Sequence, residues 1–293
     1  MTKFRPVTNR FAVDIGALQS GQIALFGLGI DANSSHLSGA AAAPGAIRAQ
    51  LHSGSGNYTT EDGTDLDGVI ADVGDVAVAN NVGSIDDLDA ITTAVDTILA
   101  AGASPLALGG DHSVTYPILR SVGRKFGAAS ADGVTIVHVD AHPDLYDDLD
   151  GNPLSHASPF ARIMEAGLCR RLVQIGIRTA TAHQREQAVR FEVETVEAPA
   201  FDSFDPASIT GPTYVSIDLD GLDPSCAPGV SHQEPGGLTT RQVLNLIAEL
   251  PGPIVGADVV ELNPTRDVVD MTAMLAGKLT KELAAKMASV LSP

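Results

Sequence analysis

Short apolar runs of strand length alternate with helical segments along nearly the whole chain of 293 residues. The runs are continuous and rich in Val, Ile and Leu, which is typical of strands buried on both faces of a parallel sheet. Short connections between alternating strands and helices favour a parallel sheet covered by helices on both sides. We therefore predict one domain over residues 1–293, an α/β fold arranged as a three-layer α/β/α sandwich with a mainly parallel central sheet. Strands are expected at residues 22–30, 69–76, 105–108, 134–139, 171–177, 213–220 and 254–260.

Helix-start signals fit the segments between these strands. Pro44 begins a helix through Leu51, because proline suits the first helical turn. Ser84 and the acidic residues after it begin a helix that continues to Gly102. Further helices are expected at residues 114–124, 155–164, 181–190, 239–250 and 269–291. No glycine pattern of the dinucleotide-binding or Walker type follows a strand, which argues against a nucleotide cofactor.

Polar side chains stand where several of the predicted strands end. The apolar run 134–139 ends in Asp140, His142 and Asp144, and similar groups follow three other strands: His112, the pair Asp218 and Asp220, and Glu261. Taken alone, the first group could be a simple turn with Pro143 as the breaker, and His112 could be a helix cap. Because the carboxyl ends of parallel strands lie along one edge of a sheet, we expect all these side chains to meet there.

Two His and four Asp side chains are more ligands than one ion needs. Four carboxylates in a partly buried cleft cannot all ionise cheaply without cations, and two divalent ions would neutralise them. Oxygen-rich ligation with two imidazoles suits Mn²⁺ best, and Zn²⁺, Ni²⁺ or Co²⁺ are the other options. Two such ions about 3.5–4 Å apart lower the pKa of a shared water, so the predicted chemistry is hydrolysis.

Two further residues have a predicted role and a simpler alternative. His156 would pass a proton to a leaving amine, or else serve only as a helix-start residue with structural hydrogen bonds. Glu261 would pair with a cationic substrate, or else form a salt bridge at the end of its strand.

Charge and hydropathy exclude several classes of partner. The 18 basic and 36 acidic side chains give a net charge of −18, which disfavours nucleic acid and anionic membranes and favours a small cationic substrate. No apolar run approaches the roughly 20 residues that span a bilayer. The basic residues Lys3, Arg5 and Arg10 are followed by no apolar segment of a secretory signal, and Asp14 argues against a transit peptide. We therefore expect a cytoplasmic protein.

With these residues assembled, the sequence resembles the ureohydrolases, the family of arginases and agmatinases. Three metal motifs carry the resemblance, in order: Gly109-Gly-Asp-His-Ser113, Asp140-Ala-His-Pro-Asp144 and Ser216-Ile-Asp-Leu-Asp-Gly-Leu-Asp-Pro224. The resemblance implies the arginase-like fold, a homotrimer or homohexamer, and two Mn²⁺ ions per chain. It implies that Asp140 and Asp218 bridge the ions, that His112 and Asp144 complete one, and that His142 and Asp220 complete the other.

The resemblance also implies a reaction, in which a hydroxide that bridges the ions attacks the guanidinium of L-arginine to give urea and ornithine. Asp144 would orient that hydroxide, His156 would be the proton shuttle, and Glu261 would bind the guanidinium.

The likeness is strongest to the plant-type arginases, through segments such as Asn33-Ser-Ser35 and Gly256-Ala-Asp-Val-Val-Glu-Leu-Asn-Pro264. The expected substrate-binding residues are Tyr146, Asn152, Ser155, Thr181, His232 and Glu261. Many arginases have an acidic residue at the position of Thr181 and Asn at that of Tyr146, and most relatives have Thr at that of His232. Agmatine, guanidinobutyrate and guanidine are therefore the alternative substrates.

Two other classes of protein are rivals to this interpretation. One is a deacetylase on the related fold, which would hold a single zinc ion. The other is an inactive metal-binding subunit of an oligomer, against which the presence of both His156 and Glu261 argues.

Overall fold

The structure is a computed structural model that describes residues 3–127 and 133–289. Within these ranges nine strands form one sheet in the order β1-β3-β2-β4-β9-β8-β5-β6-β7, parallel throughout except for β1, which pairs with β3 in the antiparallel sense. The strands are β1 Phe4–Arg5, β2 Ile23–Gly27, β3 Ile70–Val76, β4 Ser104–Leu108, β5 Thr135–Val139, β6 Arg171–Ile177, β7 Glu194–Glu197, β8 Thr213–Asp218 and β9 Ile254–Val260. The predicted mainly parallel α/β fold is confirmed.

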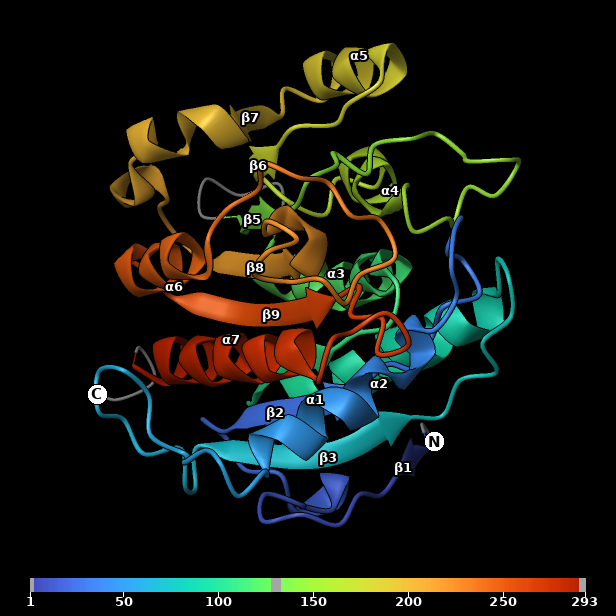
Figure 1. Ribbon diagram of the computed structural model, residues 1–293. Coiled ribbons are helices and arrows are strands. Elements are labelled where there is room, and N and C mark those ends of the chain that lie inside the picture. The colour runs from blue at the N-terminus through green and yellow to red at the C-terminus, as the bar shows by residue number, and fades with distance from the viewer. Residues whose placement is uncertain (1–2, 128–132, 290–293) are drawn as a thin grey trace.

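Helices cover both faces of this sheet and form the outer layers (Figure 1). They are α1 Ala43–Leu51, α2 Ile85–Ala100, α3 Thr115–Phe126, α4 Pro159–Glu165, α5 Ala182–Arg190, α6 Thr240–Glu249 and α7 Met271–Ala288. Alternation along β2 divides the core, since Leu25 packs with α1, α6 and α7 whereas Phe26 packs with α2, α3 and α4. Among the described residues no helix is long and apolar enough to cross a membrane.

Several boundaries differ from the prediction. The helix expected from Ser155 begins at Pro159, because residues 155–158 form a turn in which the Ser158 N–H donates to the carbonyl of Ser155. The last helix begins at Met271 instead of residue 269, since Val269 and Asp270 both have positive φ. Its predicted end at residue 291 lies outside the described residues. The edge strands β1 and β7 were not predicted: β1 has two residues, and β7 is mostly exposed and has no apolar run.

The order of the strands creates a place for a site. The chain leaves β2 for β3 on one side and then crosses to β4 on the other, so the connections after β2 and β4 run in opposite directions. A second reversal occurs at β5, which lies between β8 and β6. In open parallel sheets ligands bind outside the carboxyl ends of strands at such reversals.

Candidate active site

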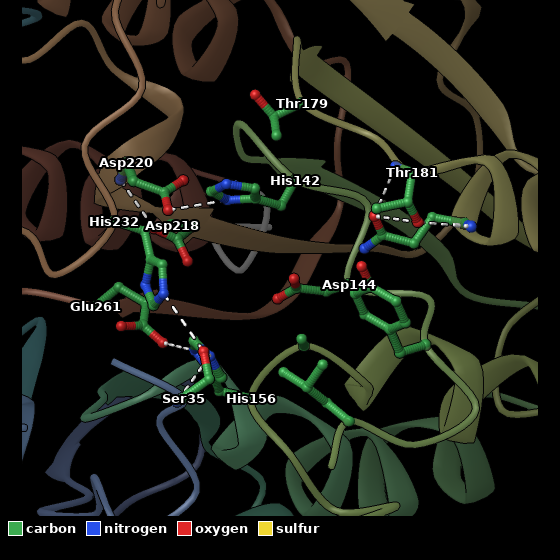
Figure 2. A pocket seen from close by; sticks show the side chains of 14 residues that line it. Ser35, His142, Asp144, His156, Thr179, Thr181, Asp218, Asp220, His232 and Glu261 are labelled. Atoms are coloured by element: carbon green, nitrogen blue, oxygen red, sulfur yellow. Dashed lines mark hydrogen bonds and ion pairs between the residues drawn. The ribbon is translucent and has the colours of Figure 1, made fainter. Parts of the chain in front are cut away.

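The predicted site residues meet at the carboxyl edge of the sheet, around a cavity of about 210 Å³. Figure 2 shows side chains from several loops directed into this cavity. The residues that line it are Ser35, His142, Asp144, Tyr146, Leu149, His156, Ala157, Thr179, Thr181, Gln184, Asp218, Asp220, His232 and Glu261. His112 and Asp140 lie below them, fully buried.

One group of ligand atoms surrounds the Nδ1 atom of His112. Carboxylate oxygens of Asp140, Asp144 and Asp218 lie 3.2, 3.1 and 3.1 Å from this nitrogen. The nitrogen itself is buried and makes no hydrogen bond. A lone pair enclosed by three carboxylates and without a proton donor is what a cation site requires.

Buried neighbours fix which nitrogen of His112 carries its proton. Ser216 donates its hydroxyl proton to Asp258 over 2.6 Å, so its oxygen is left to accept from His112 Nε2 at 2.9 Å. Asp258 also accepts hydrogen bonds from Thr115 and Tyr214. The proton of His112 is therefore on Nε2, and Nδ1 is free to bind an ion.

A second group of ligand atoms lies beside the first and shares Asp140 with it. The Nδ1 atom of His142 is 3.1 Å from Asp220 Oδ2 and 3.4 Å from Asp140 Oδ1. These three residues lie close enough together to hold a metal ion. Asp140 presents Oδ2 to His112 and Oδ1 to His142, which is the geometry of a carboxylate that bridges two ions.

His138 also lies against Asp140, with its Nε2 atom 2.7 Å from Oδ2. The amide nitrogen of Gln174 donates to the carbonyl of Pro143 and, over 3.1 Å, to His138 Nδ1. That contact leaves the proton of His138 on Nε2. His138 therefore donates to Asp140, although it is near enough to His112 and Asp140 to complete a third group of ligands.

Without cations the charges of this cluster are poorly balanced. Burial and the charges of Asp220 and Asp140 raise the pKa of Asp218 well above its usual range. Burial disfavours the charged form of His112, but the close approach of the carboxylates of Asp140, Asp144 and Asp218 outweighs burial and raises the pKa of His112. Bound divalent ions would relieve this repulsion among the carboxylates.

His156 and Glu261 form a pair at the wall of the cavity. His156 Nδ1 lies 2.9 Å from Glu261 Oε1, which also accepts the backbone N–H of His112. Burial lowers the pKa of His156, but the charge of Glu261 outweighs burial and raises it to about 9. The other oxygen of Glu261, Oε2, is buried and has no hydrogen-bond partner among the described residues.

The backbone at two site residues has an unusual conformation. Asp144 has φ +50° and Glu261 has φ +66°, in the left-handed region that favours glycine. Such strain costs about 1–3 kcal/mol and is commonly found at functional residues. Glu261 is held there by its own N–H, which donates to the carbonyl of Gly110 over 2.8 Å.

Gly110 and Gly221 allow the metal motifs to approach their neighbours. A Cβ atom at Gly110 would overlap the carbonyl oxygen of Ile30, so this position requires glycine. A Cβ atom at Gly221 would lie 2.8 Å from the backbone nitrogen of Asp140. Any side chain at either position would push two strand-end loops apart.

The structure brings only some of the predicted substrate-binding residues to the cavity. Tyr146, Thr181 and His232 line it, although the hydroxyl of Thr181 is already used to cap α5 by accepting from the Gln184 N–H. Asn152 does not line it, because its side-chain amide donates to Asn33 Oδ1 and its carbonyl caps the Leu154 N–H. Ser155 is buried behind the wall, where its hydroxyl accepts from the Ala157 N–H.

A model of the Arginase family matches residues 21–285 of the chain. The chain belongs to the arginase family. It is 48% identical over 279 residues to "Arginase 1, mitochondrial" of Arabidopsis thaliana, a match that covers 90% of this chain and 80% of the relative. It is 47% identical over 278 residues to the protein of the same name from Oryza sativa subsp. indica, covering 90% and 81%. The solved structure "Arginase from Medicago truncatula" superposes with a TM-score of 0.83 at 45% identity, covering 91% and 87%.

These comparisons confirm the resemblance that the metal motifs carried, the arginase-like fold and the expectation of a hydrolase. They correct the expected location. The relatives from Arabidopsis and rice are named mitochondrial arginases, which contradicts the cytoplasmic location expected from the sequence. One acidic residue, Asp14, among three basic ones is too weak a signal to exclude a transit peptide.

Several residues of this arginase-family site were missed by sequence reasoning. Ser35 and Thr179 line the cavity from the loops that follow β2 and β6, so their positions after strand ends were a signal that could have identified them, whereas Gln184 lines it from the first turn of α5. His138 precedes Asp140 by two residues and His142 by four, so the alternation of side chains along a strand indicated that all three lie on one side. Nothing in the sequence marked Gln174 or Asp258 as their hydrogen-bond partners.

Arg178 connects the segment after β8, which contains Asp220, to β6 through hydrogen bonds. Its guanidinium donates to the main-chain carbonyls of Gly176, Asp220, Gly221, Leu222 and Glu234, over distances of 2.6 to 3.2 Å. Four of these five residues are buried, so their carbonyls have little access to water. The loop that carries Asp220 is thereby held next to β6.

Replacing Arg178 with alanine is expected to lower the free energy of unfolding by about 2–4 kcal/mol, because several buried carbonyls lose their donor. Urea denaturation followed by circular dichroism measures this change. Arg185→Ala is the matched control, since Arg185 is exposed and forms an ion pair with Glu197, and we expect a change below about 0.5 kcal/mol there. Equal effects of the two substitutions would contradict the role of Arg178.

Proposed function

We propose that the chain hydrolyses the guanidinium group of L-arginine to urea and ornithine. One observation carries the proposal: the unpartnered, buried Glu261 Oε2 occurs in the same cavity wall as a His and Asp cluster that fits two divalent ions. A guanidinium supplies the N–H donors and positive charge that this carboxylate oxygen lacks. Family membership and identity to plant proteins named arginases support the same substrate.

Two Mn²⁺ ions would be held by the clustered residues, with Asp140 and Asp218 shared. His112 and Asp144 would complete one ion, and His142 and Asp220 the other. The unprotonated, unpartnered Nδ1 of His112 and the two-sided contacts of Asp140 support this fit. When bound, the ions would lower the pKa of a water that they share and so supply the nucleophile.

The chain's own residues would bind the substrate and move the proton. Glu261 accepts N–H groups of the guanidinium through Oε2, while its Oε1 holds the ring of His156. Asp144, which points into the cavity (Figure 2), orients the attacking water as a hydrogen-bond acceptor. His156, whose pKa is raised to about 9, holds the proton that the leaving amine needs.

The far end of the cavity favours arginine over agmatine. The lining residues there carry no carboxylate, ammonium or guanidinium group: Tyr146, Leu149, Thr179, Thr181 and Gln184. The zwitterionic end of arginine carries no net charge and suits such a wall. The lone ammonium of agmatine would have no carboxylate partner among these residues.

The proposal is tested by urea release from arginine, agmatine, guanidinobutyrate and guanidine, after Mn²⁺ or Ni²⁺ loading. We expect the highest kcat/KM with arginine, loss of activity on chelation and recovery with Mn²⁺, because the bound ions would activate the attacking water. Metal content per chain separates two ions from the single zinc of a deacetylase. No urea from any of the four compounds would refute the proposal and favour an inactive metal-binding subunit. The resemblance implies a homotrimer or homohexamer. This oligomeric state stays a prediction, and light scattering would measure it.

A further inference from the structure

Ser35 contacts His156 on the side opposite Glu261. The loop after β2 places the Ser35 backbone N–H 3.1 Å from His156 Nε2 and the Ser35 hydroxyl 2.9 Å from the same nitrogen. Ser35 lines the cavity and belongs to an exposed stretch of its loop (Figure 2). Its hydroxyl also lies 3.4 Å from His232 Nε2.

These contacts determine where the neutral ring of His156 carries its proton. A backbone N–H can only donate, so Nε2 must present its lone pair to Ser35. The proton is then on Nδ1, where Glu261 accepts it over 2.9 Å. When the ring gains its second proton, this proton is on Nε2, and the Ser35 hydroxyl oxygen is the acceptor beside it.

Ser35 contacts Nε2 and also lines the cavity, so its hydroxyl lies beside Nε2 at the cavity wall. Among the described residues, the hydrogen-bond partners of Nε2 are the N–H and the hydroxyl of Ser35, and only the hydroxyl can both accept and donate a proton. A leaving amine in the cavity therefore meets the Ser35 hydroxyl in the path to Nε2.

We propose that Ser35 sets the proton-bearing nitrogen of His156 and relays the proton between His156 Nε2 and the leaving amine through its hydroxyl. The inference rests on the proposed function. The Nε2–H bond of the imidazolium breaks as its proton bonds to Ser35 Oγ, and the original Ser35 O–H bond breaks as that proton bonds to the amine nitrogen. Serine ends as a hydroxyl and His156 as a neutral ring with its proton on Nδ1. Solvent returns one proton to the relay, for which the contact with His232 offers a route.

Three variants of the manganese-loaded chain test this relay. Ser35→Ala keeps the backbone N–H but removes the hydroxyl, and we expect kcat to fall by about 10–100-fold with little change in KM for arginine or in ion content. Ser35→Thr restores a hydroxyl and should recover most of kcat. Ser38→Ala is the matched control, because Ser38 lies in the same exposed loop but does not line the cavity.

Two results would overturn the relay. One is a Ser35→Ala variant that keeps the kcat of the unsubstituted chain. The other is an equal loss in Ser35→Ala and Ser35→Thr, or a loss of ions in either, because the loop would then act only as structure.

A measurement independent of turnover separates this inference from the proposed function. Nitrogen-15 NMR of the histidine-labelled, zinc-loaded chain, recorded above the His156 pKa of about 9 so that the ring is neutral, with His156→Ala to identify the signals, should show His156 protonated on Nδ1. A proton on Nε2 of the neutral ring overturns the assignment. If the unsubstituted chain releases no urea, the proposed function fails, whereas the NMR result still decides the tautomer that Ser35 imposes.

Discussion

Replacing Asp140 with asparagine is expected to reduce urea release from arginine by about a thousandfold or more, because several kcal/mol of charge stabilisation depend on the ions that it shares. Each Asp140 oxygen accepts a hydrogen bond from a fixed donor, Oδ1 from the His142 N–H and Oδ2 from His138. The side-chain amide of asparagine would therefore direct its NH₂ group at one of these two donors in either orientation. Ion content should fall from the proposed two per chain to about one or fewer.

Atomic emission spectroscopy and a urea assay on the same sample measure the two effects of Asp140→Asn together. The control is Asp147→Asn, an exposed aspartate on the loop after β5 that bonds to Gln187 and does not line the cavity. Its ion content and activity should stay close to those of the unsubstituted chain. An Asp140→Asn variant that retains two ions would contradict the assignment of Asp140 as the shared ligand.

The metal cluster could be predicted because its information is local. Asp140, His142 and Asp144 interrupt the sequence directly after an apolar run, and topology alone then brings them to His112 and Asp218. No side-chain packing has to be known for this step, since parallel strands share one carboxyl edge. The same reasoning identified Glu261 before any contact was known.

The partners that orient these ligands could not be predicted in the same way. Asp258 and Gln174 lie inside strands and read as ordinary polar interruptions of apolar runs. Their roles depend on the register of neighbouring strands, which aligns Ser216 with Asp258 and His138 with Gln174. Sequence periodicity does not specify that register, because strand pairing is a property of the whole sheet.

Substrate contacts were the least predictable part of the site. Asn152 and Ser155 lie in the loop between Asp144 and His156, yet both side chains hydrogen bond to their own surroundings away from the cavity. In a strand, side chains alternate between the two faces, so the sequence indicates which ones point the same way. An irregular loop has no such alternation, so the sequence does not indicate which of its side chains point into the cavity. Ser35 reaches the cavity from more than a hundred residues away in sequence, through its contact with His156.

Replacing His156 with alanine is expected to lower kcat for arginine by about 100–1000-fold, because the leaving amine loses its proton donor. KM and ion content should change little, since His156 contacts Glu261 and Ser35 and none of the proposed ligand side chains. Steady-state kinetics and metal analysis measure these quantities. Added imidazole should restore part of the lost kcat by entering the space that the side chain leaves.

The matched control for His156→Ala is His183→Ala. His183 stacks on Tyr146 beside the neutral end of the cavity, with ring centroids 5.7 Å apart, and does not contact Glu261. Loss of the His183 side chain should raise KM more than it lowers kcat, because His183 supports the cavity wall at Tyr146 and does not take part in proton transfer to the leaving amine. A His156→Ala variant that loses its ions would make His156 a structural residue. One that keeps both its ions and its full turnover would show that the proton reaches the leaving amine from another group.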